Sequence, residues 1–97
     1  MAKQLKTEPG VIIELVQDGA KMQVQRSILS PGSKIPEHSH QVASSYVVVA
    51  GHGRLTGTNG RDVGPGDAVV VDANAKHGWE NSGSDAFHIV GAFAGAA

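Results

Sequence analysis

Two histidines one residue apart, His38 and His40, follow a segment with proline and glycine in the stretch GSKIPEHSHQVASSY, residues 32–46. In an extended chain, side chains two positions apart point to the same side. Pro36 restricts the residue before it to extended conformations, which favours a strand here. Two imidazoles at this spacing can bind one metal ion through nitrogens at about 2.0–2.2 Å. The alternative is a pair of surface histidines on an edge strand, and two ligands alone do not complete a metal site.

A third candidate ligand is His77, in the stretch GDAVVVDANAKHGWENSG, residues 66–83. The chain contains no cysteine, so any metal must be bound through nitrogen or oxygen. The two histidine-containing stretches together resemble the paired sequence motifs of the cupin family. The first motif, at residues 32–51, is matched in type and spacing by Gly32, His38, His40 and Gly51. The second, at residues 66–81, is matched by Gly66, His77 and Asn81, with Asp72 and Asn74 in place of a proline and a glycine.

The resemblance implies an all-β fold, the double-stranded β-helix or jelly-roll barrel, with a metal inside it near one mouth. It implies one cupin domain over residues 1–97 and assigns the metal ligands as His38, His40 and His77. The ion would be a divalent transition metal, Fe, Mn, Ni, Zn or Cu, because imidazole does not select one of them. Within the family, an all-histidine site resembles that of thiol and diketone dioxygenases.

The chain departs from the family pattern at Ser44, which stands where the family has a glutamate ligand. A neutral hydroxyl is a weak ligand, and the nearby carboxylates of Glu37 and Glu80 are expected to face away, since each is an odd number of residues from a histidine ligand. The prediction is therefore three neutral ligands with open coordination positions. The missing anion would strengthen the pull of the ion on an anionic substrate or lower the pKa of a bound water. The alternative is that Ser44 marks decay into a module that binds no metal.

Two aromatic residues, Tyr46 and Trp79, lie two positions beyond Ser44 and His77 and should face the barrel interior. Together with Ser44 they are expected to form a pocket wall, in which Tyr46 and Ser44 are the candidate catalytic residues because a hydroxyl can donate a proton or a hydrogen bond. The alternative is that both aromatic rings only fill the core. Of the two remaining histidines, His52 is expected to be a solvated turn residue, and His88 is expected to be a core or surface residue.

The elements that position these residues are expected to be short strands. Runs of β-branched and apolar residues cover 11–16, 21–29, 45–50, 67–71 and 86–93, separated by turn signals that include Asn59-Gly60. Alternation with a period of two predicts core positions at Met22, Val24 and Ile28, to which we add Val48 and Ile89. The run 45–50 is apolar at every position except its first two, which is typical of a strand between two layers. This pattern indicates an all-β sandwich or barrel.

The composition narrows the possible partners. The chain has 97 residues and a net charge of −1, with no basic patch for nucleic acid and no apolar run long enough to cross a membrane. A cytoplasmic location is expected, and residues 1–9 and 94–97 are expected to be flexible. A homodimer is expected, with the apolar segment 11–16 pairing at its exposed edge.

The sequence therefore predicts a small metal-dependent cupin enzyme acting on a small polar or anionic molecule. Dioxygenation is the first choice of reaction, on the resemblance to all-histidine sites. Isomerisation, lyase chemistry or cyclisation, in which the metal acts as a Lewis acid, is the second. The competing hypothesis is a barrel that binds or senses a small ligand without chemistry.

Overall fold

The computed structural model describes residues 3–5 and 7–94, and within them the chain forms ten β-strands and no helix. The strands are β1 (Lys3–Leu5), β2 (Val11–Asp18), β3 (Met22–Leu29), β4 (Lys34–His38), β5 (Ser44–Ala50), β6 (Gly53–Gly57), β7 (Arg61–Val63), β8 (Ala68–Val71), β9 (His77–Glu80) and β10 (Phe87–Ala94). No helix that could cross a membrane occurs among the described residues. All five predicted runs are strands, with bounds that shift by only a few residues.

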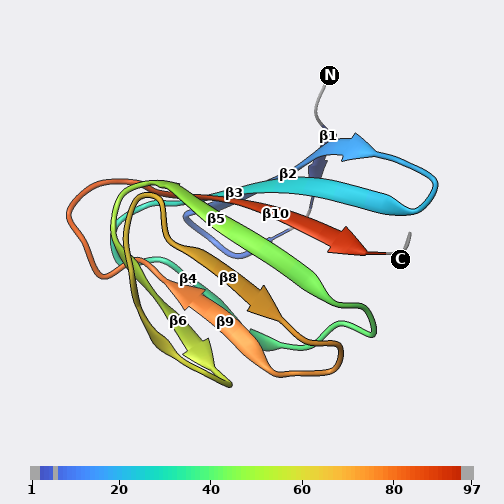
Figure 1. Ribbon diagram of the computed structural model, residues 1–97. Helices are drawn as coiled ribbons and strands as arrows, with labels where there is room; N and C mark the ends of the chain where they lie inside the picture. Colours follow the sequence, from blue (N-terminus) through green and yellow to red (C-terminus); the bar gives the residue numbers. More distant parts are fainter. Residues whose placement is uncertain (1–2, 6, 95–97) are drawn as a thin grey trace.

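The strands form two sheets that face each other as a jelly-roll barrel (Figure 1). One sheet has the strand order β1-β2-β3-β10-β5-β8 and the other has the order β4-β9-β6-β7. Every pair of neighbours is antiparallel, and β10, near the end of the chain, pairs with β3 on one side and with β5 on the other. The predicted double-stranded β-helix fold is confirmed.

The core lies between the two sheets. Its most deeply buried apolar side chains are no more than 2 % exposed: Leu29, Val48, Leu55, Phe87 and Ile89. The buried rings of Tyr46 and Trp79 pack edge to face with centroids 5.1 Å apart, a favourable aromatic arrangement. The predictions of Val48 and Ile89 as core residues are confirmed.

Strand β3 presents its faces in the opposite sense to the prediction. Leu29 is completely buried and pairs with the equally buried Phe87, which fixes the inward face of the strand. The other residues on the same face as Leu29 are polar, and they line the barrel interior: Gln23, Gln25 and Ser27. The apolar residues lie on the outer face, where Met22 is 54 % exposed and Val24 and Ile28 are partly buried. Their prediction as core residues is wrong.

The outer face of the larger sheet is apolar. Five large hydrophobic side chains on it are between 43 % and 70 % exposed: Ile12, Met22, Val47, Val49 and Val70. The prediction that residues 45–50 lie between two layers is therefore wrong, because only one face of β5 is covered. Strand β2 lies between β1 and β3, and β1 pairs with its residues 13–15, so this part of the segment 11–16 has no free edge for the expected pairing.

The expectation of flexible ends, residues 1–9 and 94–97, falls partly on residues 1–2, 6 and 95–97, which lie outside the described residues. Within the described part, Lys3–Leu5 form β1 against β2, and Ala94 is the last residue of β10. Flexibility of the remaining end residues stays a prediction.

Candidate metal centre

Three histidines come together from β4, the loop that follows it and β9: His38, His40 and His77. His38 is the last residue of β4 and His77 is the first residue of β9, and the two are partners in the register of these strands. His40 lies two residues beyond the end of β4, outside any strand. The expectation that a strand holds His38 and His40 on one face is therefore wrong for His40, although the loop still brings its ring to the same place.

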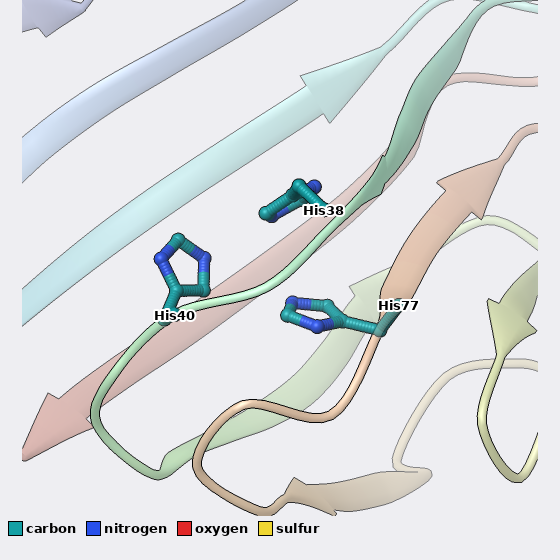
Figure 2. Close-up of side chains that lie close together, drawn as sticks. All are labelled: His38, His40 and His77. Carbon is teal, nitrogen blue, oxygen red and sulfur yellow. The ribbon is translucent and has the colours of Figure 1, made fainter.

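The three imidazole rings point toward a common space, as Figure 2 shows. The ring centroids of His38 and His77 are 4.5 Å apart, those of His38 and His40 are 4.8 Å apart, and those of His40 and His77 are 5.4 Å apart. One nitrogen from each ring lies within 4.8 Å of the other two. Donors on one ion are separated by about 2.8–3.6 Å when their bonds are about 2.0–2.2 Å long, so a rotation of the rings toward one another would bring them to binding distance.

Backbone carbonyls fix the protonation of two of the rings. Nδ1 of His38 is 2.8 Å from the carbonyl oxygen of Pro36, and Nδ1 of His77 is 3.2 Å from that of Ala75. Because a carbonyl oxygen can only accept, each Nδ1 must carry the proton when its ring is neutral. Nε2 then keeps its lone pair, and such a hydrogen bond on the second nitrogen is typical of histidines that bind metal.

A chain of hydrogen bonds connects Ser44 to the histidine cluster. The Ser44 hydroxyl, in a residue only 3 % exposed, donates to the Tyr46 hydroxyl oxygen at 3.0 Å. The Tyr46 hydroxyl lies 3.2 Å from Nε2 of His77, and it must donate there because that nitrogen is unprotonated. The two candidate catalytic residues, Ser44 and Tyr46, are thus in contact with each other, and Tyr46 also contacts the candidate metal ligand His77.

The surroundings of His40 and His77 favour the neutral ring, which is the form that binds metal. Burial lowers the pKa of His40, and positive charge on His38 or His77 would lower it further. Burial also lowers the pKa of His77, against the opposite effect of its hydrogen bond to the Ala75 carbonyl. For Tyr46, burial raises the pKa, while the hydrogen bond from Ser44 acts in the opposite direction.

A cavity of about 490 Å³ opens beside His40, which the sequence did not predict. Its lining consists of amide, hydroxyl, imidazole and apolar groups: Gln23, Gln25, Ser39, His40, Gln41, Val42 and Phe93. A smaller hollow of about 110 Å³ inside the barrel shares Gln25, His40 and Phe93 with it and reaches His38, Tyr46 and Trp79. The Phe93 ring packs against His40 at a centroid distance of 5.1 Å. In the sequence, this cavity is indicated only by Gln25, which lies four positions before Leu29 and so shares its face of the strand. The apolar residues at the alternate positions indicated the opposite orientation.

The other residues considered from the sequence lie away from the cluster or support the barrel. Glu37 and Glu80 are exposed, and the cluster contains no carboxylate among the described residues. Asn81 is 4 % exposed, and its amide donates to the carbonyl oxygens of Leu29 and Asp85, which is a structural role.

The two histidines outside the cluster differ from each other. His52 is exposed. His88 is partly buried, and its neighbour Phe87 points into the core, so His88 lies on the outer side of β10. Its Nε2 is buried with no hydrogen-bond partner among the described residues. Neither histidine belongs to the cluster.

The donor set fits a divalent transition ion. Three neutral nitrogens converge, two of them with the proton held on the other ring nitrogen, and no fourth histidine or acidic ligand closes the site within the described residues. Three protein ligands with open positions are typical of catalytic rather than structural zinc sites.

Comparison with known proteins agrees with this architecture. A family model described as "Cupin domain" matches residues 25–93. No curated protein matches the sequence. Among solved structures, a conserved protein with a double-stranded β-helix domain from Klebsiella pneumoniae has a TM-score of 0.85 at 22 % identity, covering 95 % of this chain and 83 % of that one.

Two further structures carry names that refer to enzymes. The polyketide cyclase RemF from Streptomyces resistomycificus has a TM-score of 0.84 at 16 % identity, covering 96 % of this chain and 73 % of its own. A predicted oxalate decarboxylase from Thermotoga maritima has a TM-score of 0.83 at 18 % identity, covering 97 % and 91 %. At these identities the similarity shows the fold alone.

Proposed function

The chain belongs to the cupin family, and we propose that it is a metal-dependent enzyme whose ion is held by His38, His40 and His77. The observation that carries the proposal is the convergence of three imidazoles beside a cavity, with Nε2 left free of its proton on two of them. When bound, the ion would supply a Lewis acid that polarises a substrate oxygen, or the redox chemistry of iron.

The cavity beside His40 supports a small polar substrate that carries little or no charge. Its lining residues include three glutamines and a serine but no lysine or arginine. An anionic group would therefore have only the metal ion as a counter-charge. Amide groups can both donate and accept, so they suit a ligand with hydroxyl, carbonyl or amide groups.

The proposed reaction is dioxygenation, with Lewis-acid isomerisation, elimination or cyclisation as the second choice. Oxygen uptake by the Fe(II)-loaded protein, measured with a panel of small thiols and neutral diketones, tests the first. We expect uptake with at least one diketone and none in a variant without the histidines. Disappearance of a diketone without oxygen uptake would select the second class.

A non-catalytic binding barrel is the alternative function. The amide lining favours it, because among the residues around the larger cavity only His40 can transfer a proton near neutral pH. Saturable binding of a diketone that is recovered unchanged after long incubation would support this alternative and contradict the enzyme.

Metal affinity is expected to depend on pH through the histidines. A histidine must be neutral to bind metal, and the lowered pKa values of His40 and His77 keep these rings neutral below the usual value of 6.5. We therefore expect nearly constant affinity from about pH 8 to about pH 6.5, then a decrease toward pH 5. Zinc titration against a competing chelator measures it, and constant affinity down to pH 5 would mean that other ligands dominate.

Ser44→Glu is expected to tighten metal binding by about tenfold, because it places a negative charge beside the cation. Ser44→Gln is the matched control, since it has the same size without the charge, and no gain is expected. Ser44 is 3 % exposed, so both variants require a check of folding by circular dichroism. Equal affinity in the two variants would show that a side chain at position 44 does not reach the ion.

A homodimer is the proposed assembly, formed through the apolar outer face of the larger sheet. Exposed apolar patches of this kind mark interaction surfaces. In light scattering coupled to size-exclusion chromatography, we expect the mass of two chains for the wild type and of one chain for Val47→Glu, which places a charge on this face. A monomeric wild type would contradict the proposal. A cytoplasmic location stays a prediction.

A further inference from the structure

The hydroxyl of Tyr46 contacts a ring nitrogen that a metal ion would need. It lies 3.2 Å from Nε2 of His77, the ring nitrogen whose lone pair is free because Nδ1 donates to Ala75. A metal that binds this nitrogen takes the lone pair that now accepts the Tyr46 hydrogen bond. Metal binding must therefore break that bond and leave the buried Tyr46 oxygen, still accepting from Ser44, next to a cation.

We propose that Tyr46 is the fourth protein ligand of the ion, and that its oxygen takes the place of the glutamate that Ser44 replaces in the cupin motif. The inference rests on the proposed metal site at His38, His40 and His77. On coordination the phenol would lose its proton to solvent, and its oxygen would bind the ion in place of that proton.

The distance between Tyr46 and His77 agrees with this role. Two donors with bonds of about 2.0–2.2 Å at angles between 90° and 109° lie about 2.8–3.6 Å apart. The Tyr46 oxygen and His77 Nε2, at 3.2 Å, are already within that range.

The charge of the site favours an anionic oxygen. Three neutral histidines leave both positive charges of a divalent ion uncompensated, and the cluster contains no carboxylate among the described residues. A divalent cation favours an anionic oxygen donor over a neutral one. Ser44 supports the anion because its hydroxyl already donates to the Tyr46 oxygen.

The sequence makes the inference easy to test by spectroscopy. Tyr46 is the only tyrosine of the chain and there is no cysteine, so a charge-transfer band from phenolate to iron can have only one origin. The protein would be loaded with Fe(II) without oxygen and oxidised to Fe(III) with ferricyanide. We expect a visible charge-transfer band, and resonance Raman excitation within it should enhance tyrosine ring vibrations.

Two variants complete the experiment. Tyr46→Phe should lack the band and bind zinc at least about tenfold more weakly, whereas Ser44→Ala should keep the band, since it removes only the hydrogen bond to the ligand oxygen. Iron bound to the wild type at about one ion per chain without a band would overturn the inference and leave the metal site standing. Tyr46→Phe binding zinc as tightly as the wild type, or more tightly, would overturn it in the same way.

Failure of the metal site itself gives a different result. If the wild type binds neither zinc nor iron after reconstitution, the proposed function fails, and Tyr46 cannot be a ligand. The wild-type spectrum and stoichiometry decide both questions even if Tyr46→Phe does not fold.

Discussion

Replacement of both His38 and His77 by alanine is expected to remove metal binding completely. These two residues are register partners on β4 and β9, and of the three clustered histidines only His40 is left, which cannot hold an ion even with Tyr46 beside it. After reconstitution with a first-row divalent metal, elemental analysis should find about one ion per chain in the wild type and only background in the double variant.

The matched control for this prediction is His52→Ala. His52 is exposed and does not belong to the cluster, so its loss should leave the metal content unchanged. Because His77 is only 1 % exposed, circular dichroism must show that the double variant is folded. A wild type as empty as the double variant, or a double variant as full as the wild type, would contradict a site built on these residues.

Phe87→Ala is expected to be the most destabilising single substitution in the core. Phe87 is completely buried, its ring packs against Trp79 at a centroid distance of 6.2 Å, and it fits so closely over Gly53 that a methyl group there would overlap it. Loss of a buried phenyl ring costs about 3–5 kcal/mol of the free energy of unfolding. For a chain of this length, the melting temperature should fall by about 12 °C or more.

Chemical denaturation of the metal-free protein measures this cost. Phe87→Leu provides a graded comparison, since it keeps most of the apolar volume and should lose clearly less free energy than the alanine variant. A loss below about 1 kcal/mol for Phe87→Ala would show that the barrel end near Gly53 closes over the missing ring.

The residues that resemble the family motifs predicted the fold and the place of the three histidines. The spacing of the motif residues was sufficient to predict that His38 and His77 lie together, because the fold determines how the strands that hold them pair. His40 reached the cluster for another reason, since its loop and not a strand places it. The bond between Tyr46 and His77 could not be predicted, because it joins residues 31 positions apart and depends on how the two sheets pack.

The orientation of the strands was the main information that the sequence did not contain. Alternation shows which residues share a face, but not which face is inside. In β3 the glutamines point inward because the strand borders a cavity, and Met22 points outward. In β5, an uninterrupted apolar run looked like a strand covered on both sides, whereas Val47 and Val49 are about half exposed.

The position of His40 beyond the end of β4 has a consequence for the kinetics of metal exchange. His38 and His77 are held by the hydrogen-bonded ladder of two paired strands, whereas the backbone of His40 is tied to the neighbouring loop through the amide of Asn74, which donates to its carbonyl oxygen at 2.7 Å. Rotation of His40 away from the ion therefore disturbs no strand pairing. Since the larger cavity opens beside this residue, arrival and departure of the ion should proceed through the loop side, with His40 the last ligand to bind and the first to dissociate.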